Sequence, residues 1–149
     1  MSFYLEFDDG SDPEFGRVLE FGWSGLVAAA RIWDFLGSEK GEALQEMLDE
    51  ELAIPEGQSM SWVSQSQIAR LIDLLRGIET EAKGKLVDAA WKVLPEHIER
   101  VEREAPDLGE RDTGSSGPYL SFARPLSEAL STRAFLERAQ RLGSDITIE

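Results

Sequence analysis

The sequence predicts a mainly α domain of the α+β class, with five or six helices and a small sheet of two or three strands from the termini. Three observations support this. Residues 64–94 carry a long helical repeat of apolar side chains, shorter segments repeat the same spacing, and both chain ends alternate between apolar and other residues. The length suits one domain, so we expect residues 1–149 to form a single domain.

The N-terminal segment predicts a strand followed by a turn. Residues 2–7 alternate along the chain, as in a half-buried strand. Residues 8–14, DDGSDPE, are typical of a turn. Asp12 and Pro13 resemble a helix start, because proline suits the first helical position. The apolar residues between 15 and 19 then predict one or two helical turns.

Two amphipathic helices are expected next. Ser24 predicts the N-cap of a helix that ends before Gly37, a favourable C-terminal glycine. Ser38 predicts the start of a further helix that runs to about Leu52. Glu51 falls within the apolar arc of this helix. Either the helix frays before Glu51, or this carboxylate is partly buried and has a partner elsewhere.

The central stretch has the strongest helical signal. Ser64 and Gln67 form a capping-box pattern at its start. The apolar residues from Ile68 to Ala82 occupy an arc about 160° wide, which suits a central helix in contact with several others.

A second apolar block, residues 86–94, follows with the same spacing. Gly77 and Gly84 lie near the join, and each costs about 1 kcal/mol relative to alanine inside a helix. One kinked helix and two helices both fit this pattern. Pro95 is expected to end the run, because proline lacks the amide hydrogen that a helix interior needs.

The C-terminal third predicts two helices, a loop and two strands. Residues 96–104 and 126–142 have helical spacing. Residues 105–118 are rich in glycine and proline and predict a loop. Residues 119–123 and 145–149 alternate and predict short strands.

Charge is the outlying property of this chain. The net charge is −14, from 29 acidic and 15 basic residues. Residues 1–60 hold 14 acidic and 3 basic residues, a net of −11, whereas residues 61–149 have a net of −3. Such acidity disfavours direct binding to nucleic acid or to an anionic membrane and favours a basic protein partner.

The amino-acid composition excludes several kinds of chemistry and cellular location. The chain has no cysteine, which excludes disulfides and thiolate catalysis. No stretch approaches the roughly 20 apolar residues that a membrane helix requires. The first ten residues lack the basic region of a secretory signal. We therefore expect a soluble, cytoplasmic protein, and the sequence leaves its oligomeric state open.

The predicted helix 38–52 carries its acidic residues on one side, in a stripe about 100° wide. No lysine or arginine follows any of them at i+4, so pairing within the helix is absent. This acidic stripe consists of Glu39, Glu42, Glu46, Asp49 and Glu50.

Three neighbours complete the predicted partner-binding set: Glu51, Glu56 and Trp62. Two interpretations fit Trp62, namely an exposed anchor for a partner and a hydrophobic staple packed before the Ser64 cap. A stripe that is only a solvated helix face explains the pattern equally well.

Other chemical motifs are weak. Residues 112–116, DTGSS, match the letters around the catalytic aspartate of pepsin-like proteases, but no apolar strand precedes them and no second copy exists. His97 is the sole histidine and lies in no HExxH motif. The acids of residues 8–14 do not have EF-hand spacing. We predict no catalytic residue, no metal site and no cofactor.

The sequence thus favours an acidic, non-enzymatic protein-interaction domain. Its most concrete form is an immunity or antitoxin-type inhibitor that binds a basic toxin or nuclease through the acidic N-terminal half. A small carboxylate- or metal-dependent hydrolase is the first alternative, and it requires paired acids with shifted pKa values inside a pocket. A DNA mimic is the second alternative.

Overall fold

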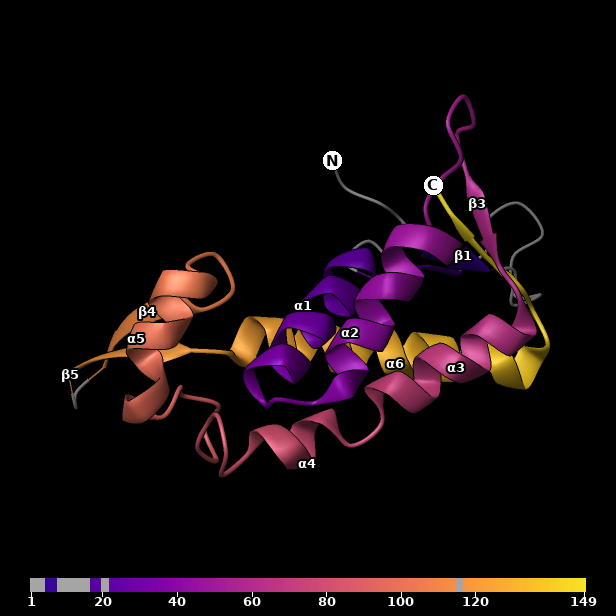
Figure 1. The fold of residues 1–149 in the computed structure, drawn as a ribbon. Coiled ribbons are helices and arrows are strands. Elements are labelled where there is room, and N and C mark those ends of the chain that lie inside the picture. Colours follow the sequence, from indigo (N-terminus) through magenta and orange to yellow (C-terminus); the bar gives the residue numbers. More distant parts are fainter. Residues whose placement is uncertain (1–4, 8–16, 20–21, 115–116) are drawn as a thin grey trace.

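The computed structural model describes residues 5–7, 17–19, 22–114 and 117–149. It confirms a mainly α domain with a small sheet. Figure 1 shows the helices side by side along the molecule, with a sheet that contains β1 and β3 at one end and the β4–β5 hairpin beside α5 at the other.

Within the described part of the chain, the helical body consists of six α-helices and one π-helical segment, η1. Helix α1 packs against α6 and α2, and α3 packs against α6. Their facing sides hold most of the buried apolar residues, which form one core. The bounds are α1 Gly22–Phe35, α2 Glu39–Glu46, η1 Met47–Glu51, α3 Gln65–Leu75, α4 Ile78–Ala82, α5 Pro95–Glu104 and α6 Ala123–Leu142.

The four-stranded sheet joins the two chain ends. Its strands are all antiparallel and follow the order β2-β1-β6-β3. The predicted strands near both ends are therefore confirmed where they are described. Leu5, Val63 and Ile148 are buried on the inner side. The bounds are β1 Leu5–Phe7, β2 Arg17–Leu19, β3 Ser61–Val63 and β6 Ile146–Ile148.

The helical turn expected over residues 15–19 is wrong for the part that is described. Arg17–Leu19 is strand β2, which pairs in register with β1. Pairing with the neighbouring strand β1 outweighs the weak helical preference of this short segment. The predicted turn over residues 8–14 lies outside the described residues.

Helices α1 and α6 cross at a close contact between small residues. A Cβ atom at Gly25 would lie 2.6 Å from the backbone oxygen of Glu128 and would also clash with the Thr132 hydroxyl. That hydroxyl is buried and donates to the Glu128 carbonyl at 2.8 Å. Helix α1 begins at Gly22, so Ser24 lies inside the helix and the prediction of an N-cap at Ser24 is wrong.

The central stretch consists of two helices followed by an irregular segment. The predicted capping box is present: Ser64 accepts from the Gln67 amide, and the Gln67 side chain accepts from the Ser64 amide at 2.9 Å. Helix α3 ends before Gly77, whose φ of 82° interrupts the helical path before α4.

The helix expected for residues 86–94 is wrong. This segment forms turns and isolated β-bridges, although Leu86, Val87 and Val93 are buried as the apolar pattern required. Pro95 is the first residue of α5, where proline needs no amide partner, so it starts a helix as well as ending the preceding stretch.

The loop expected over residues 105–118 is partly a hairpin. Strand β4, Glu110–Gly114, pairs with β5, Gly117–Ser121, which confirms the predicted strand at its first three residues. Asp112 of the DTGSS motif therefore lies in a hairpin strand. Helix α6 follows and is capped at its C-terminal end by Gly143. The φ of this residue is 65°, a left-handed conformation that favours glycine.

Candidate functional site

The acidic stripe lies on α2 and η1, as predicted. Ser38 caps α2, and its hydroxyl accepts from the Lys40 amide at 3.2 Å. Leu44 and Leu48 are buried against the core on the inner side of the helix, so the opposite side faces solvent. All five stripe residues are exposed.

The stripe carboxylates lack cationic partners among the residues that the structure describes. Asp49 accepts one neutral hydrogen bond, from the Gln45 amide group at 3.0 Å. Lys40 is the sole cation within residues 39–51, and it is engaged elsewhere. Its ammonium lies 4.8 Å from the centre of the Trp33 ring and donates to the Arg76 carbonyl.

Most acids of residues 61–149 have the opposite arrangement, because a lysine or arginine lies within ion-pair distance. The cations of this region are thus largely neutralised internally, and the stripe stands out as uncompensated negative charge. Examples are Asp73 with Arg76, Glu79 with Lys83, Glu81 with Lys85, Glu104 with Arg100, Glu110 with Arg124 and Glu137 with Arg133.

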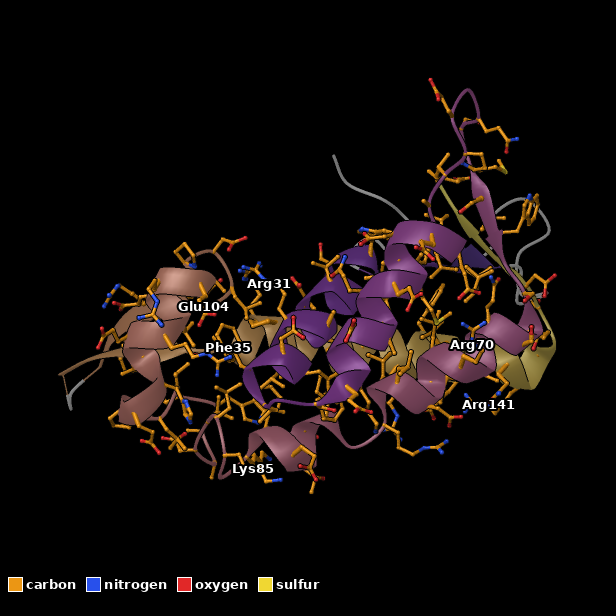
Figure 2. All side chains as sticks on the ribbon, viewed as in Figure 1. Arg31, Phe35, Arg70, Lys85, Glu104 and Arg141 are labelled. Carbon is orange, nitrogen blue, oxygen red and sulfur yellow. The ribbon has the colours of Figure 1, made fainter. Side chains whose placement is uncertain are left out.

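The π-helical segment explains why Glu51 is not buried. The Leu52 amide donates to the Met47 carbonyl at 2.9 Å, a bond that spans five residues. This wider turn rotates Glu51 away from the apolar side. Its carboxylate accepts two hydrogen bonds from Arg70, at 2.5 and 2.9 Å. Arg70 projects from α3 (Figure 2), so the partner of Glu51 comes from another element and the carboxylate is paired without being buried.

This pair gives a pH-dependent prediction. The hydrogen bond from Arg70 lowers the pKa of the Glu51 carboxyl. A folded-state pKa below the unfolded one adds stability above the unfolded pKa, and that stability is lost as pH falls through the folded pKa. Glu51→Gln is expected to reduce the free energy of unfolding at neutral pH by at most about 1 kcal/mol, because the pair is exposed.

Urea unfolding of wild type and Glu51→Gln, from neutral to acidic pH, measures this difference. We expect the two curves to converge at acidic pH. The control is Glu50→Gln, which removes a stripe carboxylate with no cation partner in the described chain and should leave stability nearly unchanged. A Glu51→Gln effect that persists undiminished in acid would contradict the assignment.

The remaining predicted residues lie on the two elements that follow. Glu56 is exposed in the loop between η1 and β3. Trp62 is 64% exposed on the outer face of the sheet, where it pairs with Thr147 of β6. The staple interpretation of Trp62 is therefore wrong. The structure brings Glu51 to the end of the stripe and places Trp62 on a separate element.

A hollow of about 590 Å³ adjoins the end of the stripe, and the sequence did not predict it. Its described walls come from three segments: the loop 52–59, Trp23 at the start of α1, and Ile148–Glu149 at the end of β6. Glu56 is among its lining residues. No local pattern connects these segments, since the pairing of β6 with its neighbours brings them together.

Other potential sites show no organised chemistry in the described segments. No group of three or more histidine, aspartate or glutamate residues is placed to hold a metal there. Asp8, Asp9, Asp12 and Glu14 lie outside the described residues. Glu81 and Asp107, like Glu51, have their pKa lowered by hydrogen bonds from a neighbouring cation. A catalytic acid at neutral pH needs the opposite shift.

No described helix combines the length and apolar character of a membrane span. Comparisons of the chain with protein-family models, with curated proteins and with solved structures gave no match.

Proposed function

We propose that this chain is an acidic interaction domain that binds a basic protein through the acidic stripe. One observation carries the proposal. The stripe presents five exposed carboxylates with no cation partner among the described residues, whereas most acids of residues 61–149 are paired within the chain. Among the described residues, these five uncompensated carboxylates therefore gather on one side of α2 and η1.

Unpaired carboxylates favour association for a specific reason. A partner's lysine or arginine can approach the stripe without displacing an internal cation. An approach to Glu79 or Glu137 would instead compete with Lys83 or Arg133, which already lie at 2.9 and 2.7 Å. The field of the stripe also raises the rate at which basic surfaces are encountered.

The most concrete form of the proposal is an immunity or antitoxin-type inhibitor. Enzymes that act on nucleic acid carry basic surfaces, because they must attract phosphate. An acidic helix held by a buried apolar side is suited to cover such a surface. Leu44 and Leu48 fix the helix in the core, so the stripe is ordered before binding.

Capture from a native lysate tests this function. The immobilised protein is loaded at low salt and washed at about 0.5 M salt. At that salt concentration the Debye length is roughly 4 Å, so attraction between exposed charges farther apart than this is largely screened. We expect one basic protein in stoichiometric amount. Two variants with the same change in net charge are run in parallel: Glu42→Gln with Asp49→Asn on the stripe, and Glu96→Gln with Glu99→Gln on α5.

The stripe variant should lose the captured protein, and the α5 variant should keep it. Equal loss from both variants would show that net charge alone is responsible. Capture of many basic proteins that all elute with salt would refute a specific partner and leave only non-specific attraction.

A further inference from the structure

The hollow at the end of the stripe is continuous with it along the chain. Residue 51 ends η1, and Leu52 is the first residue of the loop that lines the hollow. Figure 1 shows this loop projecting beyond the helices, beside the end of the chain that follows β6. Along the chain, the hollow therefore begins directly after η1 ends.

The walls of the hollow are mainly apolar. Trp23, Ile54 and Pro55 provide an aromatic and aliphatic lining, and Ile148 of β6 adds to it. The volume of about 590 Å³ falls within the range of about 300–1,000 Å³ typical of ligand pockets. It is large enough for a bulky side chain and part of its neighbours.

The charge of the described lining is negative. Glu56 and Glu149 are lining residues, and the described lining contains no lysine, arginine or histidine. Both glutamates are exposed. The site therefore combines an apolar interior with acidic groups in solvent, which complements an apolar side chain next to a cation.

We propose that this hollow receives a large apolar side chain of the basic partner, flanked by lysine or arginine residues that face Glu56 and Glu149. This inference rests on the proposed function and names the place where the basic partner is anchored. Exposed ion pairs contribute about 0–1 kcal/mol each, so the stripe alone holds a partner weakly. Desolvated aromatic anchors in pockets provide most of the affinity at typical interfaces.

Two acetylated peptides serve as probes: Lys-Lys-Phe-Lys-Lys and its counterpart Lys-Lys-Ala-Lys-Lys. Both carry the same charge, so only the side chain offered to the hollow differs. Binding is followed at low salt by NMR of labelled isoleucine methyl groups. We expect the phenylalanine peptide to bind about tenfold more tightly, which corresponds to 1.4 kcal/mol. We also expect it to shift the Ile54 and Ile148 signals, which the alanine peptide leaves in place.

A filling variant tests the location. Ala53 is an exposed lining residue, so Ala53→Trp adds a large side chain at the hollow without disturbing the core. The phenylalanine peptide should lose its advantage in this variant. Ala89→Trp, at an exposed position in the turn before Trp91, is the matched control and should retain the advantage.

The outcomes separate the two proposals. Equal affinities for both peptides, with binding that depends on the stripe, would overturn the anchoring hollow and leave the stripe as the site. An advantage for phenylalanine that survives Ala53→Trp would also overturn it. Failure of both peptides to bind at low salt would refute the basic-partner function, and the anchoring step with it.

Discussion

Gly25→Ala is expected to reduce the free energy of unfolding by about 2 kcal/mol, because the added methyl group would force α1 away from α6. The nearest atoms include the backbone oxygen of Glu128, at 2.6 Å from an ideal Cβ position. A backbone atom of a packed helix cannot rotate aside as a flexible side chain can. The Thr132 hydroxyl, which also clashes, is buried and held by its own hydrogen bond.

Whether Gly25→Ala lowers or raises the free energy of unfolding distinguishes a steric clash from a gain in helix propensity. Helix propensity alone predicts that Gly25→Ala stabilises the protein by about 1 kcal/mol. Urea unfolding of Gly25→Ala and of the control Ala134→Gly separates the two effects, since Ala134 is an exposed residue of α6. The control should lose about 1 kcal/mol from propensity alone. If Gly25→Ala raised stability, the close crossing of α1 and α6 would be wrong.

Features set by local interactions could be predicted from the sequence. The capping box of Ser64 and Gln67 needs only residues within one turn, and it forms as expected. The acidic stripe is likewise a property of one helix, so its position on α2 and η1 follows from spacing. The sequence could predict only that no cation of the same helix pairs with the stripe. Cations of other elements can also approach this helix, as Arg70 of α3 does at Glu51, and sequence spacing does not reveal them.

Residues 83–94 show where local periodicity fails. Buried residues in a turn-rich segment can match helical spacing by chance, since burial alone produces an apolar pattern. The chain there is directed by backbone features instead. Gly84 has a φ of 87° and Trp91 a φ of 63°, and the Asp88 carboxylate accepts from the amides of Ala90 and Lys92. Aspartate bonds of this kind favour turns over helices.

Features that depend on distant partners could not be predicted. Strand β2 exists because β1 lies beside it, and β4 exists because β5 returns along it. The hollow requires the loop 52–59, α1 and β6 to meet. In each case the information lies in pairings between segments, which a window of neighbouring residues does not contain.

Glu42→Lys with Asp49→Lys is expected to slow association with the captured basic partner by about 10- to 100-fold at low ionic strength. Both residues are exposed on the acidic stripe, so the double change reverses its field at two separate turns. Dissociation should change less, because these substitutions leave the residues of the proposed anchoring hollow unaltered. Stopped-flow mixing measures the association rate directly.

The control reverses the same number of charges at Glu96 and Glu99 of α5, which are also exposed. Both double variants have the same net charge, and urea unfolding checks that each is folded, since reversal at Glu99 also breaks its ion pair with Arg103. A difference in association rate between them therefore reports where the charge lies. This difference should shrink as added salt shortens the screening length from about 10 Å at 0.1 M to about 3 Å at 1 M. Equal association rates for the two variants would mean that total charge, and not the stripe, attracts the partner.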